Sequence, residues 1–124
     1  MKAQLPPLLL LAIFAAFSFA KRKEPAEVPP IVHGEFIYTV PHGAADNGTA
    51  QNGGFVRVLD AKTGTYVWGI QVYKINYDDS LETDAQDVFI TSIELNFWRT
   101  QLIVRNESEQ EFRIDLSKRV VVSN

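Results

Sequence analysis

The chain contains no cysteine among its 124 residues. Disulfide bonds, thiol catalysis, a cysteine-based zinc site and a lipid-anchored cysteine are therefore excluded. Histidine is scarce too, because His33 and His42 are the two present. Neither stands in a Ser-His-Asp or paired-histidine arrangement, and no catalytic or cofactor motif is visible. We therefore expect a protein that is not an enzyme and binds no cofactor.

Positive charge is scarce beyond the start of the chain. The formal net charge is -3, and acids outnumber bases after the basic cluster Lys21-Arg22-Lys23. No basic stripe with interleaved aromatic residues is present, so nucleic acid is not an expected partner. A hydrophobic content of 46% and a charged content of 22% are typical of a folded globular protein. At this length the chain has room for one domain.

Residues 1–20 have the pattern of a secretory signal. Lys2 precedes an apolar run over residues 8–17, and the segment ends in Ser18-Phe19-Ala20, with small residues where a signal peptidase reads. The run is short for a membrane-spanning helix, which needs about 20 apolar residues. The cluster over residues 21–23 resists translocation, so an uncleaved anchor is the alternative. We expect a secreted, periplasmic or envelope protein, with membrane contact only through residues 1–20 if they are retained.

Residues 21–30 (KRKEPAEVPP) are charged and contain three prolines. Proline lacks the amide donor of a central strand and favours extended structure before it. The segment is therefore predicted to be a linker, followed by a single domain over residues 31–124.

Apolar residues recur at every second position through most of the domain. Because side chains alternate between the two faces of a strand, this spacing predicts strands with one buried face. No segment after residue 20 has helical periodicity over three turns. The seven predicted strands lie within residues 36–40, 55–59, 66–77, 89–97, 102–104, 112–116 and 120–122. Short connections favour an all-β antiparallel meander, folded as a sandwich or a barrel of about seven strands.

The segment Leu59–Trp68 (LDAKTGTYVW) resembles the tail of a quinoprotein-type β-propeller repeat, with its Asp, Thr-Gly turn and Trp. The resemblance covers ten residues and occurs once, whereas a propeller needs at least about four blades. It implies a hairpin turn at Asp60–Gly64 and no propeller function. A truncated relative of a larger repeat protein, with bare edge strands, is a further alternative.

Two other connections are predicted from their composition. Asn106–Glu109 is a plausible four-residue hairpin loop. Residues 41–54 (PHGAADNGTAQNGG) lack large apolar side chains and are predicted to be a mobile surface loop. The triplets at Asn47 and Asn106 also satisfy the N-glycosylation sequon.

The densest charge feature is an acidic stretch over residues 78–87. Hard cations such as calcium bind several carboxylate oxygens from one flexible loop, so a calcium-binding domain is one alternative function. A small metal-dependent hydrolase, using these carboxylates with the histidines, is another form of it. The spacing does not match the EF-hand pattern. The acidic residues are Asp78, Asp79, Glu82, Asp84 and Asp87.

Phe97 and Trp98 break the alternation of the strand that precedes them. Adjacent strand residues face opposite ways, so one of the two, most reasonably Trp98, is expected on the surface. An exposed tryptophan can anchor a partner. We therefore predict a non-enzymatic binding or structural module of the cell envelope or exterior, with Trp98 as the candidate contact to a protein partner.

Overall fold

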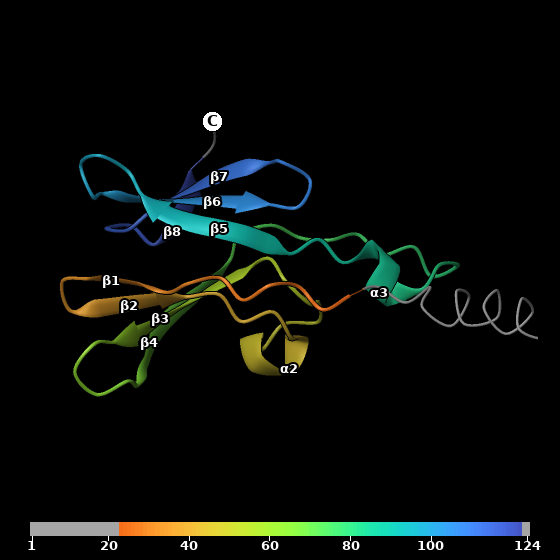
Figure 1. Cartoon of the computed structure of the whole chain (residues 1–124), viewed down its shortest axis with the longest axis horizontal. Coiled ribbons are helices and arrows are strands. Elements are labelled where there is room, and N and C mark those ends of the chain that lie inside the picture. Colours follow the sequence, from red (N-terminus) through yellow and green to blue (C-terminus); the bar gives the residue numbers. More distant parts are fainter. Residues whose placement is uncertain (1–22, 123–124) are drawn as a thin grey trace, which may run out of the picture.

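The computed structural model describes residues 23–122, and the predicted signal segment with its cleavage site lies outside that range. Two four-stranded antiparallel sheets lie face to face (Figure 1). The first sheet contains β1 (Ile31–His33), β2 (Phe36–Thr39), β3 (Phe55–Asp60) and β4 (Tyr66–Gln71). The second contains β5 (Ile90–Leu95), β6 (Gln101–Asn106), β7 (Glu111–Asp115) and β8 (Val120–Val122). Two one-turn helices, α2 (Ala44–Asn47) and α3 (Thr83–Gln86), lie in the connections.

Each strand pairs with its neighbours in the order of the chain, so both sheets are meanders. The predicted all-β antiparallel sandwich is confirmed. The barrel alternative is wrong for the described residues, because the strands divide into two sheets instead of closing on themselves. This division follows the long connection over residues 72–89, which carries the chain from one sheet to the other (Figure 1).

The core lies between the sheets and is built from alternating residues of both. Val56 and Val58 face inward from β3, and Leu102 and Val104 face them from β6, each fully buried. Removing such side chains from water stabilises the fold by about 1.5–3 kcal/mol apiece. Across the interface the rings of Tyr73 and Phe112 stack with their centroids 5.1 Å apart. Period-two burial therefore supplies most of the cohesion between the layers.

The eighth strand, β1, was not among the seven predicted. It has three residues and follows Pro29-Pro30, so its own pattern is too short to reveal a strand. Pairing with β2 creates it, with Val32 opposite Ile37 and His33 opposite Phe36.

Part of the predicted linker is packed against the domain. Val28 is 6% exposed and belongs to the core cluster. The carbonyl of Ala26 lies 2.9 Å from Nε2 of His42. The packed domain therefore takes in residues before Ile31.

The predicted surface loop over residues 41–54 is largely packed as well, and that expectation is corrected. Gln51 is 5% exposed, and its amide nitrogen donates to the carbonyl of Tyr73 while its amide oxygen accepts from the amide of Ile75. Gly54 has φ 72° and lies so close to Tyr73 that a Cβ would approach its carbonyl oxygen to 2.9 Å. These contacts bind the segment after Gln71, which explains why β4 ends there instead of continuing to Tyr77.

Candidate functional site

Four connections meet at one end of the sandwich, which we call the turn end: residues 34–35, 60–65, 96–100 and 115–119 (Figure 1). The amide of Ala61 donates to the carbonyl of Glu35 at 2.8 Å and joins two turns of the first sheet. The amide of Leu116 donates to the carbonyl of Thr100 at 3.0 Å and does the same in the second. The connections thus form one continuous surface.

Phe97 and Trp98, which we call the aromatic tip, project from the turn between β5 and β6. Their side chains are 85% and 77% exposed, and the rings meet edge to face with centroids 4.9 Å apart. The exposure predicted for Trp98 is confirmed, but the reason given for it is corrected. Both residues lie in the turn beyond Leu95, so strand alternation places neither of them, and both are on the surface.

The turn that carries the aromatic tip is held by its first residue. Oδ1 of Asn96 accepts from the amides of Thr100 and Gln101 at 2.8 and 3.0 Å. The amide of Arg99 donates to the carbonyl of Asn96, and Arg99 has φ 57°, in the left-handed region. Asparagine supplies this kind of local bond readily. The tip therefore stands on a turn of defined geometry.

Exposed apolar residues concentrate at the turn end. Large hydrophobic side chains scattered singly over a surface are ordinary, whereas a cluster marks an interaction site. Within residues 23–122, six large hydrophobic residues are exposed, and one of them, Leu81, lies at the opposite end. Four lie at or beside the turns, Val32, Phe97, Trp98 and Val120, whereas the ring of Tyr66 extends along β4 toward Gly69 and the α2 segment.

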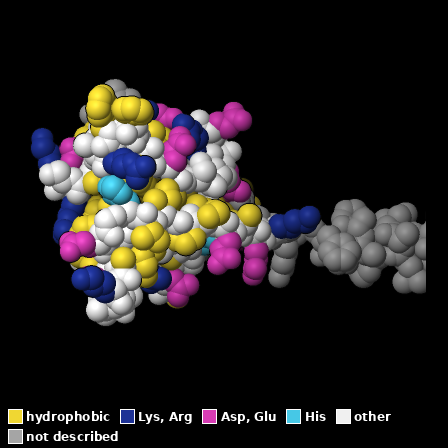
Figure 2. Space-filling model, turned by 60° about the vertical axis from the view of Figure 1, so that its left-hand side comes forward, with side chains coloured by type: hydrophobic (Ala, Val, Ile, Leu, Met, Phe, Trp, Pro, Cys, Tyr) yellow, Lys and Arg dark blue, Asp and Glu magenta, His cyan; other side chains and the backbone are white. Residues whose placement is uncertain are grey.

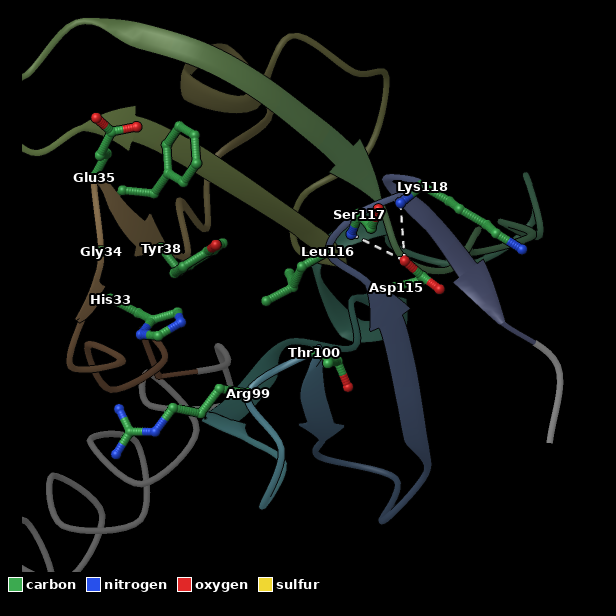
Figure 3. Close-up of a pocket in the computed structure, with 11 residues that line it drawn as sticks. His33, Gly34, Glu35, Tyr38, Arg99, Thr100, Asp115, Leu116, Ser117 and Lys118 are labelled. Carbon is green, nitrogen blue, oxygen red and sulfur yellow. Dashed lines mark hydrogen bonds between the residues drawn. The ribbon is translucent and has the colours of Figure 1, made fainter.

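A hollow of about 700 Å³ opens between the sheets beside the aromatic tip. Its apolar lining comes from Phe36, Tyr38 and Leu116, and Arg99 and Lys118 add positive charge to its rim (Figure 3). Burial raises the pKa of the Tyr38 phenol, against an opposing effect of nearby Arg119. The hollow is therefore an open, apolar-lined depression with cations at its edge.

The hollow does not assemble the catalytic group that a hydrolase would need. His33, Glu35 and Asp115 all line it, but their side chains lie on different sides and point apart (Figure 3). The carboxylate of Asp115 accepts from the amides of Ser117 and Lys118 at 2.9 and 2.8 Å, so it closes its own turn. Nothing in this arrangement brings a histidine and two carboxylates to one reacting atom.

The two ends of the sandwich differ in charge. The turn end as defined carries four bases and three acids, whereas the connections at residues 41–54, 72–89 and 107–110 carry one base and eight acids. One of the three acids, Asp60, accepts from the amides of Lys62 and Thr63, which lowers its pKa. Figure 2 shows apolar and basic side chains interleaved over the turn end around a histidine. The four bases are Lys62, Arg99, Lys118 and Arg119.

In the acidic stretch over residues 78–87, two of the carboxylates are engaged in hydrogen bonds within the domain. Asp87 is 4% exposed and accepts from the hydroxyl of Tyr77 and the amide nitrogen of Asn52. Burial, followed by that hydrogen bond, raises the pKa of Tyr77 to about 12. Asp78 accepts from the amide and hydroxyl of Ser80. Within residues 23–122 no three histidine or carboxylate side chains converge so as to hold a metal ion.

The remaining sequence candidates serve the fold. His42 contacts the ring of Phe89 edge to face, with centroids 5.2 Å apart, far from His33 at the turn end. Both sequon asparagines are buried, and their side-chain nitrogens donate within the domain, Asn47 to Gln51 and Asn106 to Gln110. Neither nitrogen is free to carry a glycan in this fold.

No family model, curated protein or solved structure matches the chain. In the described part of the chain, neither helix has the length and apolar character needed to cross a membrane. The turn end is therefore the surface from which a function can be inferred.

Proposed function

We propose that this chain is an exported, non-enzymatic binding module of the cell envelope or exterior, and that it makes its contact through the turn end. The single observation that carries the proposal is the exposure of Phe97 and Trp98, at 85% and 77%, on one turn. Aromatic side chains with this exposure are enriched at the centres of binding surfaces. Trp98 is the residue we expect to contribute most.

The fold makes no demand for aromatic residues at these two positions. The turn is closed by Asn96 and by the left-handed backbone of Arg99, and the side chains between them point to solvent. Exposed rings also lower the solubility of a protein, and these two do not stabilise the fold in exchange. Function is the simplest reason for their presence.

Export is supported by the signal-like pattern of residues 1–20, and the absence of cysteine is compatible with a domain held together by packing alone. The sequence predicts a protein as the partner, and an envelope also presents lipid. A protein and a lipid are each a partner to which a non-enzymatic module could bind through the turn end.

Photo-crosslinking in the producing cells tests the proposal. p-Benzoylphenylalanine replaces Trp98 in one variant and Ser108 in another, which is the equivalent position of the turn between β6 and β7. We expect crosslinked products from position 98 in the envelope fraction, and mass spectrometry then identifies them as protein or lipid. A second change, Phe97→Ser, should reduce the yield because it removes the neighbouring ring.

The control at position 108 separates specific contact from random collision. Equal crosslinking from positions 98 and 108, or none from position 98, would contradict the proposal. The double variant Phe97→Ser, Trp98→Ser should unfold within about 0.5 kcal/mol of the parent, since exposed surface substitutions cost little. This measurement shows that a lost contact is not a lost fold.

A further inference from the structure

The aromatic tip lies at the end of the molecule where four bases and exposed apolar side chains also gather. Trp and Phe rings settle at the boundary between headgroups and acyl chains, where an apolar body and a polar edge are both satisfied. Arg99 follows the tip directly, and a long basic side chain beside an inserted ring reaches back to the phosphates. Resting on the proposed function, we propose that the turn end docks on an anionic lipid bilayer, with Phe97 and Trp98 inserted among the headgroups.

The charge distribution gives the docking its orientation. Anionic lipid attracts the four bases of the turn end and repels the eight acids of the connections at the other end. A molecule with this charge separation turns its basic end toward a negative surface even when its net charge is negative. Lys118 and Arg99 both line the rim of the hollow, and their side chains extend to different sides of it (Figure 3).

The shape of the turn end favours lipid over a protein partner. Val32 and Val120 lie on strands beside two other turns, so the apolar side chains gathered around the tip come from three separate turns. A protein interface needs a complementary, closely packed patch, whereas a fluid bilayer adapts to projections of any outline. The projecting tip and its basic neighbours are suited to a bilayer.

The first residues that the structure describes lie away from the aromatic tip. Glu24 and Pro25 lie beside His42 and Phe89, at the end of the sandwich opposite to the turns. A signal specific to Trp98 therefore reports the aromatic tip and not the N-terminal segment.

Tryptophan emission of the exported form, mixed with vesicles, tests the inference. The chain has two tryptophans, Trp98 at the tip and Trp68, which is 8% exposed and has the Arg119 guanidinium 5.2 Å over its ring. The emission change that Trp98→Phe removes is therefore the one that reports docking of the tip. With vesicles of equal parts phosphatidylcholine and phosphatidylglycerol, we expect a blue shift and quenching by brominated acyl chains. Vesicles of phosphatidylcholine alone should bind more weakly, and added salt should remove the difference.

Variants identify the groups responsible. Phe97→Ser should weaken vesicle binding by about tenfold or more, because a whole ring no longer leaves water. Arg99→Glu with Lys118→Glu should weaken it by a similar factor at low salt. Ser108→Ala, in the equivalent turn, should leave binding unchanged, and Trp98→Phe should abolish the spectral shift.

An unchanged Trp98 emission with all vesicles would overturn the inference. If position 98 still crosslinked to a protein in cells, the proposed function would stand with a protein as partner. Failure of both measurements would refute the proposed function as well.

Discussion

The turns that enter and leave β6, Asn96–Thr100 and Asn106–Gln110, are both held by their asparagine, although its oxygen binds the amides four and five residues on in the first and those two and four residues on in the second. In each, the side-chain oxygen of asparagine accepts from two later amides, and its nitrogen donates to the side chain four residues on. In each, the amide three residues later donates to the asparagine carbonyl at 3.0 Å. The residues at that position, Arg99 and Glu109, have φ 57° and 61°.

Their surfaces are opposite in character. Phe97 and Trp98 occupy the middle of the first turn, and Glu107 and Ser108 occupy the middle of the second. Glu107 serves the fold, because its carboxylate accepts from the amide of Phe89 at 2.8 Å. The rings of the aromatic tip instead face solvent. Both turns thus use an asparagine and a left-handed residue three positions later, and neither of these requirements dictates which side chains stand between them.

The largest effect should come from Asn106→Ala. Asn106 is 3% exposed, so its truncation leaves a cavity in the packed interior and also removes the acceptor of the Ser108 and Gln110 amides. We expect a loss of about 2–3 kcal/mol in the free energy of unfolding, measured in urea. Ser108→Ala is the control and should change it by less than about 0.5 kcal/mol. A loss below that of the control would show that the turn is closed by other means.

Asn96→Ala should cost less, although it also removes the acceptor of two backbone amides. Asn96 is half-buried, so its truncation leaves no enclosed cavity and water can reach the amides that lose their acceptor. We expect a loss of about 1 kcal/mol in the same urea experiment. Equal losses for Asn96→Ala and Asn106→Ala would mean that burial is not what distinguishes the turns.

The smallest expected effect on stability concerns the turn between β3 and β4, which begins with Asp60 instead of an asparagine. Hydrogen bonds from the amides of Thr63 and Lys62 lower the pKa of Asp60. Its stabilisation is therefore present above the unfolded pKa of about 3.9 and is lost as the pH falls through the lower folded value. Unfolding of the parent and Asp60→Asn, followed from neutral to acidic pH, should differ in slope in that window. Identical slopes would contradict the assignment.

The sequence predicted the strands well and their limits less well. Period-two alternation located the segments that form β2–β8, because a strand with one buried face has apolar residues at every second position. It missed β1, whose three residues gain their structure from β2. It also extended β4 to Tyr77, because nothing local reveals that Gln51 binds the backbone of Tyr73 and Ile75.

Of the residues in the candidate site, the sequence predicted one, Trp98. Trp98 was expected on the surface, and its role as a partner contact stays a prediction. Phe97 was missed because its spacing matches the strand before it, and the strand ends two residues earlier than alternation suggests. Asn96 was the available signal, since asparagine at a strand end favours a turn.

The amino-acid order by itself determined the strands, the turn at Asp60–Gly64 and the absence of sulfur chemistry, because each depends on neighbouring residues or on composition. Only the tertiary structure decided that two sheets form instead of a barrel, that Val28 and Gln51 are buried, and that four turns meet at one end. These outcomes depend on contacts between residues far apart in the chain. The gathering of exposed apolar and basic side chains beside Phe97 and Trp98 is of the same kind, since it arises from where the meanders turn.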